Sequence, residues 1–446
     1  MSLRSTSADS ASVSVDGRER PRVLIIAIGD LARLSKIHKV AWTLTTAGYE
    51  VVRLGFKVSD DDMTESNDEY GLVVRLDTER ALPDSDGGAA DESTGVGESP
   101  LRRTLKKQLF RFRAGRILRK RVVDRRSARA SMRFIGHQNA RLYDAAVQMN
   151  PDLVMSSQFN ALPAGYRAAR GLRVPFVYDA RDLVCAWTAD SPALRRQYSQ
   201  LEGHFIRRAD LVVAVSPEMA DHIASEYSVA RPLVVYNGSL VRAGAATPPH
   251  QPVRLLYQGR FSPERRLSDL VEAVRLLGGL AHLTLQGWGV EEAALREKVR
   301  TLDLDEWVAF VGPVRPVDTP LFANDYDVGV IGYAGSTENL RVAAPNKLFD
   351  YLGAGIAVLA SDLPGTRSVL ESGRCGILFE PTGPQAIADA VRKIAEDPDA
   401  LYQMKANALA VWDRYSWDKQ GQKLLGEIDR LLDRERLLEE TDDDGE

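Results

Sequence analysis

Short runs of consecutive apolar residues alternate with amphipathic stretches along most of the chain. Residues 22–28 form the first continuous apolar run, and residues 50–56 form the second. Such runs are typical of strands that are buried on both faces of a parallel sheet. Between them, residues 34–46 place apolar side chains three or four positions apart, which predicts an amphipathic helix. The chain therefore opens with a β-α-β unit, although it lacks the Gly-x-Gly-x-x-Gly fingerprint of a dinucleotide site.

The same alternation continues in two blocks. Further strands of the first block are predicted at residues 71–76, 152–156, 175–178, 211–215 and 233–236. A Pro- and Gly-containing linker near 240–252 separates the blocks. Strands of the second block are predicted at residues 253–257, 282–285, 308–311, 327–331, 356–360 and 376–379. Because helical spacing returns between these strands, the pattern predicts an α/β fold of two doubly wound, Rossmann-like domains that face a central cleft.

The blocks also set the expected boundaries along the chain. We expect a disordered tail at residues 1–20, an N-terminal acceptor domain at 21–240 and a C-terminal domain at 253–410. A helix is predicted at 411–436, followed by an acidic tail at 437–446.

Composition narrows the class of protein. Of the 446 residues, 44% are hydrophobic and 27% are charged, which is ordinary for a soluble globular chain. Cys185 and Cys375 lie far apart, with no second cysteine or metal-ligand spacing near either. This favours a reducing compartment and argues against a disulfide framework or a zinc site. Residues 1–21 contain no apolar signal segment, and no apolar run approaches the ~20 residues of a membrane span. We therefore expect a cytoplasmic protein.

Charge is distributed unevenly in the first block. Residues 78–100 are acidic and of low complexity, which predicts a disordered loop. Residues 101–133 then carry many Lys and Arg side chains, with apolar residues at helical spacing in the first turns. A basic helix of this kind can bind an anionic membrane surface, and this is the interpretation we favour. A polyanionic acceptor and a solvated helical face are the alternatives. Few aromatic residues accompany the arginines, so nucleic acid is not expected as a partner.

Candidate chemistry gathers in the second block at the ends of predicted strands. A helix is expected to begin near Pro345 and Asn346, which places Lys347 and Asp350 on one helix face. Arg260, Arg265 and Arg266 lie together on the loop that follows residues 253–257. Glycines accompany both basic segments, and glycine-rich loops that lead into helices expose N–H groups to anions. Guanidinium groups are suited to phosphate oxygens. These residues predict a diphosphate site.

Four segments resemble glycosyltransferase family 4, whose members have the GT-B fold and use nucleotide-diphosphate sugars. Residues 257–265 (YQGRFSPER), with 270–273 (LVEA), resemble its Gly-Arg-Leu…Pro-Glu-Lys…Glu-Ala signature. Residues 345–355 (PNKLFDYLGAG) resemble its Pro-x-Lys-x-x-Glu-Tyr-x-x-x-Gly segment. Residues 176–182 (FVYDARD) are similar to its Tyr-Asp-Ala-His-Glu segment, and 415–417 (YSW) resemble the start of its last helix, which crosses back onto the first domain. The resemblance covers residues 22–432, apart from the acidic loop.

The resemblance assigns a role to individual residues. Arg260 and Arg265 are expected to hold the diphosphate of the donor, and Asp350 its ribose. The remaining donor contacts that the resemblance implies are Gly29, Gly312, Val314, Asn339, Asn346 and Lys347, with the base near 312–315. Asp30, Arg181 and Glu338 are expected to have catalytic roles around the donor sugar or the acceptor. The resemblance further implies retention of anomeric configuration, with no metal and no cofactor beyond the donor itself.

Three departures from the family pattern qualify these roles. Arg265 stands where the family usually has Lys, and the positive charge is kept. The family often has two Glu separated by seven residues; here the second is Asp350, Val342 stands at the first, and Glu338 is nearby but out of register. Arg181 stands where His is frequent, and it could bind an anionic sugar or a phosphate.

These features indicate transfer of a sugar to a lipid-linked, polysaccharide or other cell-envelope acceptor at the inner face of the membrane. Two alternatives remain open: a nucleotide-sugar epimerase with the same fold, and a non-catalytic sugar-nucleotide-binding protein.

Overall fold

The computed structural model describes residues 20–29, 31, 34–57, 64–77, 113–188, 191–314 and 318–443. The side chains of 113–123, 185, 187 and 434–443 also lie outside the description. The predicted disordered tail at 1–20, except for its last residue, and the acidic loop at 78–100 therefore fall outside the described residues, as do Asp30 and Arg315.

The first lobe is built on an eight-stranded sheet with the order β3-β4-β2-β1-β5-β6-β7-β8. Its strands are β1 Arg22–Ala27, β2 Glu50–Phe56, β3 Glu65–Asp68, β4 Gly71–Leu76, β5 Leu153–Ser157, β6 Phe176–Ala180, β7 Leu211–Ala214 and β8 Leu233–Val234. All neighbouring strands are parallel except β3 and β4, which are antiparallel. The sequence did not predict β3, because this edge strand reads Glu-Ser-Asn-Asp and has no apolar pattern.

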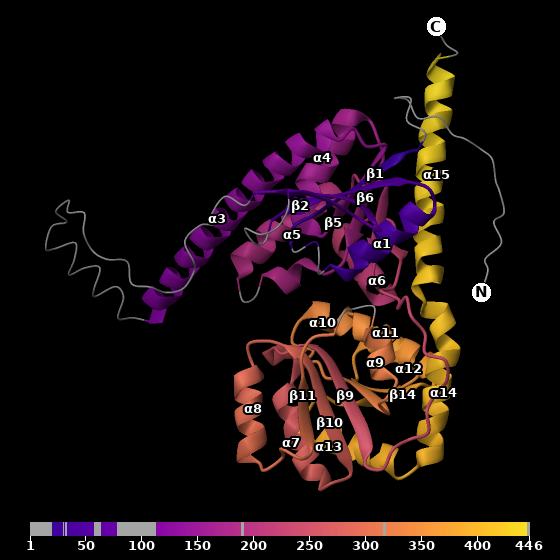
Figure 1. Ribbon diagram of the computed structural model, residues 1–446. Helices are drawn as coiled ribbons and strands as arrows, with labels where there is room; N and C mark the ends of the chain where they lie inside the picture. Colours follow the sequence, from indigo (N-terminus) through magenta and orange to yellow (C-terminus); the bar gives the residue numbers. More distant parts are fainter. Residues whose placement is uncertain are drawn as a thin grey trace, which may run out of the picture.

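Helices cover both faces of this sheet (Figure 1). They are α1 Ser35–Thr46, α3 Arg113–Gln148, α4 Leu162–Leu172, α5 Pro192–Ile206 and α6 Pro217–Tyr227, with short 3-10 turns η2 Phe159–Ala161 and η3 Val184–Trp187. Successive strand side chains point to opposite faces. Leu24 and Ile26 of β1 therefore join the cluster under α3 to α6, whereas Val23 and Ile25 pack with α1 and the C-terminal helix.

The predicted basic helix corresponds to α3, but its bounds differ. Residues 101–112 lie outside the description, and the helix continues past Arg133 to Gln148. Ala128, Ile135 and Leu142 are buried against the first lobe. This helix therefore anchors itself on the sheet by its C-terminal half, while its N-terminal end extends away from the sheet in Figure 1.

The second lobe contains a fully parallel six-stranded sheet with the order β11-β10-β9-β12-β13-β14. Its strands are β9 Val253–Arg260, β10 Ala281–Trp288, β11 Val308–Val311, β12 Val328–Ile331, β13 Ala357–Ser361 and β14 Gly376–Phe379. Its helices are η4 Pro263–Arg265, α7 Leu267–Leu277, α8 Glu292–Thr301, α9 Thr319–Ala323, α10 Glu338–Val342, α11 Asn346–Ala354, α12 Pro364–Gly373, α13 Pro384–Ala395 and α14 Pro398–Tyr415.

The C-terminal helix crosses back to the first lobe, as predicted, but its bounds differ. Helix α14 runs along the second lobe, and α15 (Trp417–Asp443) runs along the first (Figure 1). The prediction placed one helix at 411–436 and an acidic tail after it, whereas residues 411–415 end α14 and α15 continues to Asp443. Trp417 is fully buried, and its Nε1 lies 3.0 Å from the carbonyl oxygen of Lys39 and 2.9 Å from Oγ1 of Thr43. The buried indole fixes α15 to α1. The chain therefore passes between the lobes twice, in the linker that follows β8 and at the junction of α14 and α15.

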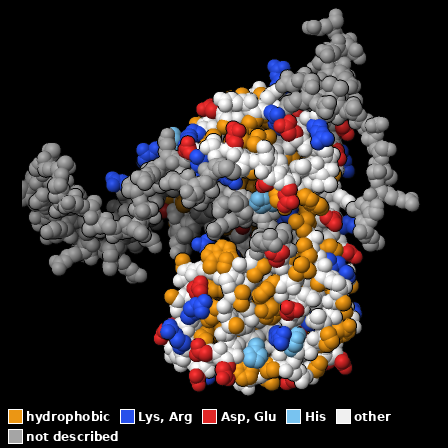
Figure 2. Space-filling view, in the orientation of Figure 1, with side chains coloured by type: hydrophobic (Ala, Val, Ile, Leu, Met, Phe, Trp, Pro, Cys, Tyr) orange, Lys and Arg blue, Asp and Glu red, His pale blue; other side chains and the backbone are white. Residues whose placement is uncertain are grey.

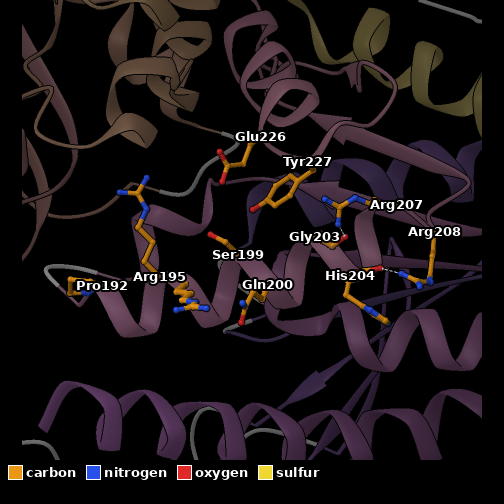
Figure 3. A pocket seen from close by; sticks show the side chains of 11 residues that line it. Pro192, Arg195, Ser199, Gln200, Gly203, His204, Arg207, Arg208, Glu226 and Tyr227 are labelled. Atoms are coloured by element: carbon orange, nitrogen blue, oxygen red, sulfur yellow. Dashed lines mark hydrogen bonds between the residues drawn. The ribbon is translucent and has the colours of Figure 1, made fainter. Parts of the chain in front are cut away.

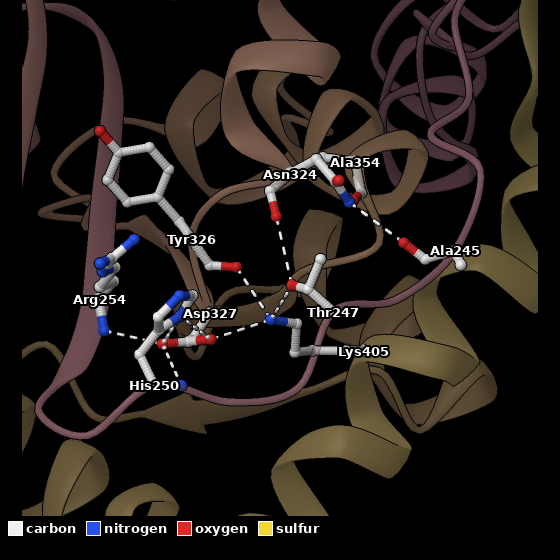
Figure 4. A network of polar contacts seen from close by, with 9 residues as sticks. All are labelled: Ala245, Thr247, His250, Arg254, Asn324, Tyr326, Asp327, Ala354 and Lys405. Carbon is white, nitrogen blue, oxygen red and sulfur yellow. Dashed lines mark hydrogen bonds and ion pairs between the residues drawn. The ribbon is translucent and has the colours of Figure 1, made fainter.

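A buried polar network holds the linker to the base of the second lobe (Figure 4). Lys405 of α14 and Asp327, just before β12, are both fully buried and lie 2.9 Å apart. The Lys405 ammonium also donates to Oγ1 of Thr247 at 2.9 Å and to the carbonyl of Tyr326 at 3.0 Å. His250 contacts the Asp327 carboxylate through its ring at 3.1 Å. The second half of the linker is therefore part of the second lobe.

Candidate functional site

A cavity of about 490 Å³ lies between the lobes, at the carboxyl ends of strands in both sheets. Its lining includes eight of the residues that the sequence singled out: Arg181, Arg260, Arg265, Val314, Asn339, Asn346, Lys347 and Asp350. This is the place where open α/β sheets bind ligands. On the face of the second lobe that Figure 2 shows, basic and acidic side chains are interspersed. The grouping of cations inside the cavity therefore differs from the outer surface.

The second lobe supplies two cations that each have one buried nitrogen atom without a hydrogen-bond partner among the described residues. The Arg265 guanidinium is also 3.8 Å from the Glu264 carboxylate. The Arg265 guanidinium stacks 4.5 Å from the ring centroid of Tyr333, and the Lys347 ammonium lies 3.7 Å from that of Tyr257. Neither Nε of Arg265 nor Nζ of Lys347 has a hydrogen-bond partner among the described residues. Burying charged donors in this way is costly unless an acceptor is bound. An anion in the cavity would remove that cost.

Burial lowers the pKa of Lys347 well below its usual value, and repulsion from Arg265 lowers it further. The Asp350 charge acts in the opposite direction. Two like charges held this close without an anion are unfavourable, so a negatively charged ligand would stabilise the protonated lysine.

Glycines at the ends of β9 and β10 make room for this arrangement. Gly259 has a φ of 129°, and a Cβ there would lie 3.4 Å from Nζ of Lys347. Gly287 has a φ of 140°, and a Cβ there would lie 1.9 Å from the carbonyl oxygen of Gly259. A side chain at either position would strain the backbone and crowd the site. Both glycines line the cavity.

Helix α11 begins beside these cations. It starts at Asn346, one residue after Pro345, which confirms the predicted start. No side chain caps this end of the helix. The free N–H groups and the positive end of the helix dipole therefore add to the potential that Lys347 and Arg265 create.

Asp350 lies one turn later and faces a lysine of the first lobe. Burial raises the pKa of Asp350 to about 6, opposed by Lys39, by a hydrogen bond with Ser239 and by Lys347. Burial lowers the pKa of Lys39 to about 8, opposed by Asp350. The Lys39 ammonium donates to the carbonyls of Asn237 at 3.0 Å and Gly238 at 2.7 Å. Lys39 therefore links α1, the end of the first lobe and the ribose-binding candidate Asp350.

Sequence reasoning missed Lys39. The one available signal was a lysine next to Val40 and Ala41, within the apolar side of a predicted helix. Its charge partner on α11 lies more than 300 positions away in the sequence, so only the folded chain identifies the pair.

The first lobe contributes Arg181, which directly follows β6. Its Nε and Nη1 are buried and donate to no acceptor in the described chain. The two flanking carboxylates are occupied: Asp179 binds Nζ of Lys36 at 2.6 Å, and Asp182 accepts a hydrogen bond from Asn339 at 3.2 Å. Arg181 thus adds to the cavity, from the opposite lobe, a further cation with buried nitrogen atoms that lack a hydrogen-bond partner in the described chain.

Asn339 bridges the lobes in this structure. Its amide oxygen accepts the backbone N–H of Leu183 at 2.8 Å, and its amide nitrogen donates to Asp182. Nearby, Oγ of Ser216 donates to the carbonyl of Val342 at 2.7 Å. The predicted donor contact of Asn339 remains a prediction, since its side-chain groups are engaged with the first lobe although the residue lines the cavity.

The structure does not bring every predicted residue into the cavity. Glu338 lies outside the lining, 3.9 Å from the His222 ring and 3.6 Å from the Arg341 guanidinium. Gly29 and Gly312 are also outside the lining, and Gly29 is exposed. Asp30 is not among the described residues. In the ranges that the structure covers, no three His, Cys, Asp or Glu side chains form a group that could hold a metal ion.

A larger hollow of about 840 Å³ lies on the first lobe, along α5 and α6 (Figure 3). Its lining includes Arg195, Arg196, Arg207 and Arg208. Arg207 and Arg208 donate to carbonyl groups of their own helix, at Gly203 and His204. This hollow lies on one lobe, and its lining holds none of the predicted site residues. The cavity between the lobes is therefore the better candidate.

Comparison with known proteins shows which protein family this chain resembles. Residues 252–397 match the family model "Glycosyl transferases group 1", and residues 44–238 match "Glycosyl transferase 4-like domain". The chain is 25% identical over 397 residues to a glycogen synthase of Mycobacterium tuberculosis, which covers 86% of both chains. It is 24% identical over 319 residues to a D-inositol 3-phosphate glycosyltransferase of Gordonia bronchialis, covering 63% of this chain and 66% of the relative.

Solved structures share the architecture at low identity. Sucrose-phosphate synthase of Thermosynechococcus elongatus aligns with a TM-score of 0.65 and 16% identity, over 93% of this chain and 99% of the other. HepE of Anabaena in complex with UDP aligns with a TM-score of 0.65 and 14% identity, over 92% and 100%. Across the described part of the chain, no helix combines the length and hydropathy needed to cross a membrane. The family models, the relatives and the two facing parallel sheets together identify this chain as a GT4-type glycosyltransferase with the GT-B fold.

Proposed function

We propose that this glycosyltransferase moves a hexose from a nucleotide-diphosphate sugar to a lipid-linked, polysaccharide or other cell-envelope acceptor, without a metal ion and with retention of configuration. One observation carries the donor assignment: Nε of Arg265 and Nζ of Lys347 are buried at the cavity without a hydrogen-bond partner among the described residues, beside the uncapped start of α11. A diphosphate supplies the missing acceptors.

The relatives support this choice of substrates. The Anabaena neighbour HepE is described in complexes with UDP and with UDP-glucose, and another relative is named an amylovoran biosynthesis glycosyltransferase of Erwinia amylovora. That second relative is 25% identical over 150 residues, which is 33% of this chain. Polysaccharide assembly is therefore one activity known by name among proteins similar to this chain.

In the proposed reaction the bond between the sugar and the diphosphate breaks, and negative charge grows on the leaving phosphate. Arg265, Lys347 and the N-terminus of α11 stabilise that charge from fixed positions in the cavity between the lobes. These cations take the role that a metal ion has in other transferases. Asp350 accepts a ribose hydroxyl. The Asn339 bridge holds the lobes together over the cavity, which limits hydrolysis of the donor.

A membrane-bound acceptor fits helix α3. Arg125, Arg126, Arg129 and Arg133 are exposed on α3, whereas Ala128 is buried. Basic side chains on one helix face attract anionic lipids by about 1 kcal/mol each near the surface. Replacing these four arginines by Gln is expected to reduce sedimentation with phosphatidylglycerol vesicles, and equal sedimentation of both proteins would contradict the membrane assignment.

The donor assignment is tested by nucleotide binding. Lys347→Met and Arg265→Met should each weaken the best-bound of UDP, GDP, ADP and dTDP roughly tenfold to a hundredfold in isothermal titration calorimetry, because each removes a charged hydrogen bond. Arg196→Met, in the lining of the hollow along α5, is the matched control and should leave the affinity unchanged. Unchanged affinity in both cavity variants would rule the site out. Turnover of the corresponding nucleotide sugar with a lipid extract distinguishes transfer from binding without catalysis.

A further inference from the structure

Arg181 has no role in holding the diphosphate in the scheme above, and its surroundings point to a different anion. We propose that the substrate carries a second negatively charged group, a phosphate or a carboxylate, which binds the Arg181 guanidinium on the first-lobe side of the cavity. This inference rests on the proposed function, because it assumes that the cavity holds the donor and the acceptor. The inference assigns an anionic group to either the donor or the acceptor.

The guanidinium is charged, lies in the cavity and has unmet donors. Arg181 is the first residue after β6, and its Nε and Nη1 atoms are buried. Within the described ranges neither atom has a hydrogen-bond partner. An arginine side chain keeps its charge at all physiological pH values, so it cannot escape the cost of burial by losing a proton. Arg181 therefore has two buried N–H groups that can donate hydrogen bonds to a bound anion.

The carboxylates next to Arg181 do not pair with it. Asp179 is buried in an ion pair with Lys36, in which the two side chains are 4% and 1% exposed. Ser157 also donates to Asp179, at 3.4 Å. Asp182 accepts from Asn339, and no ion pair between Asp182 and Arg181 occurs in the structure as described. Both of these carboxylates are thus engaged elsewhere.

Arg181 influences the pKa values of different lysines from those that face the diphosphate. After burial, the main charge that lowers the pKa of Lys347 is that of Arg265, its neighbour in the second lobe. Arg181 instead lowers the pKa values of Lys36 and Lys39, after the larger effect of burial on both. The cavity therefore contains two groups of cations. One belongs to the second lobe, and the other belongs to the first lobe and includes Arg181.

Lys36 and Lys39 have partners, whereas Nε and Nη1 of Arg181 have none among the described residues. Lys36 is balanced by Asp179, and Lys39 is opposed by Asp350 and donates to two carbonyls. The remaining charge of the first-lobe group is the guanidinium. A planar fork of N–H donors matches two oxygens of a carboxylate or a phosphate. A neutral hydroxyl would leave the charge uncompensated, so a second anion fits better than an uncharged sugar.

Two sources of that anion are possible, and the experiment separates them. In the first arm, protein saturated with its best nucleoside diphosphate is titrated with glucose 6-phosphate and with glucose, as probes of an anionic acceptor. In the second arm, binding of the nucleotide glucuronate is compared with binding of the nucleotide glucose, as a probe of an anionic transferred sugar. Both arms are run on the unchanged protein, on Arg181→Gln and on Arg181→Lys.

One arm should show a preference of roughly tenfold to a hundredfold for the anionic probe, the value of one charge-assisted contact. Arg181→Gln should remove the preference and Arg181→Lys should keep part of it, while the affinity for the bare nucleotide stays within about twofold in both. The Lys variant guards against a loss that reflects misfolding.

Two results would overturn the inference: no preference for the anionic probe in either arm, or a preference that Arg181→Gln retains. A loss of nucleotide affinity in Arg181→Gln as large as that in Lys347→Met would also overturn it, because Arg181 would then belong to the diphosphate site. Failure of the proposed function looks different, since no nucleoside diphosphate would bind to the unchanged protein at all.

Discussion

Two buried ammonium groups of the second lobe have opposite surroundings. Lys405 lies at the base of the lobe, fully buried, with contacts to Asp327, Thr247 and the Tyr326 carbonyl (Figure 4). The Nζ atom of Lys347 lies at the cavity, over the Tyr257 ring, with no hydrogen-bond partner in the described chain. Burial lowers the pKa of both lysines, and Asp327 opposes the effect at Lys405. One site is complete without a ligand, and the other is not.

The difference separates a structural charge from a functional one. A buried charge that the chain itself satisfies contributes to one arrangement of the fold, here the position of the linker on the second lobe. A buried charge that the chain leaves unsatisfied lowers stability, and proteins retain such groups where a ligand completes them. Burial alone would have placed both lysines in one class. The contacts of each nitrogen distinguish them.

The largest expected effect is on stability at the complete site. Lys405→Met leaves the Asp327 carboxylate buried without its cation, and breaking such a pair costs about 3–5 kcal/mol. The free energy of unfolding, measured in urea, should fall by that amount, with the nucleotide affinity of the folded protein unchanged. Lys393→Met, on the exposed side of α13, is the control and should change it by less than about 0.5 kcal/mol.

The same measurement on Lys347→Met sharpens the comparison. Removing a buried charge that has no partner should leave the free energy of unfolding unchanged or raise it. Equal losses in Lys405→Met and Lys347→Met would mean that both lysines are structural.

Glu202, a buried carboxylate of the first lobe, is intermediate between the satisfied Lys405 and the unsatisfied Lys347. Glu202 of α5 is buried and accepts hydrogen bonds from the Tyr178 and Tyr227 hydroxyls. Burial raises the pKa of Glu202 to about 7, although both hydrogen bonds oppose the shift. The folded state therefore holds this proton more tightly than the unfolded state, and stability is lost as pH rises from about 4.5 to 7. A shift of this size corresponds to about 3 kcal/mol.

Glu202→Gln tests that assignment. The variant should lack this contribution, so the difference in unfolding free energy between pH 4.5 and 7 should shrink by about 3 kcal/mol relative to the unchanged protein. Paired urea titrations at the two pH values measure it. An identical pH dependence in both proteins would show that folding does not shift the pKa of Glu202.

The fold was predictable from local patterns, whereas the partners within the site were not. Continuous apolar runs identified the parallel strands, and the spacing of Lys347 and Asp350 placed both on α11 facing one cavity. The polar edge strand β3 has no such pattern and was missed. Glu338 lies in a segment whose direction depends on contacts with the first lobe, through Asn339 and Val342. Sequence spacing carries no information about such contacts between lobes.

The smallest expected effect is a change in bound protons. Burial and Arg265 lower the pKa of Lys347 in the free protein, and a bound diphosphate raises it again by adding negative charge nearby. Nucleotide binding should therefore take up protons, at most about one, at pH values between the free and the bound pKa, and affinity should fall as pH rises through that window.

Calorimetric titrations in buffers with different ionisation enthalpies measure that proton uptake. Asp350 and Lys39 also titrate, with pKa values of about 6 and about 8, so the informative quantity is the uptake in the unchanged protein minus that in Lys347→Met. A positive difference assigns the proton to Lys347. No difference would mean that the ammonium already carries its full charge before the nucleotide arrives, and the contrast with Lys405 would then lie in hydrogen bonding alone.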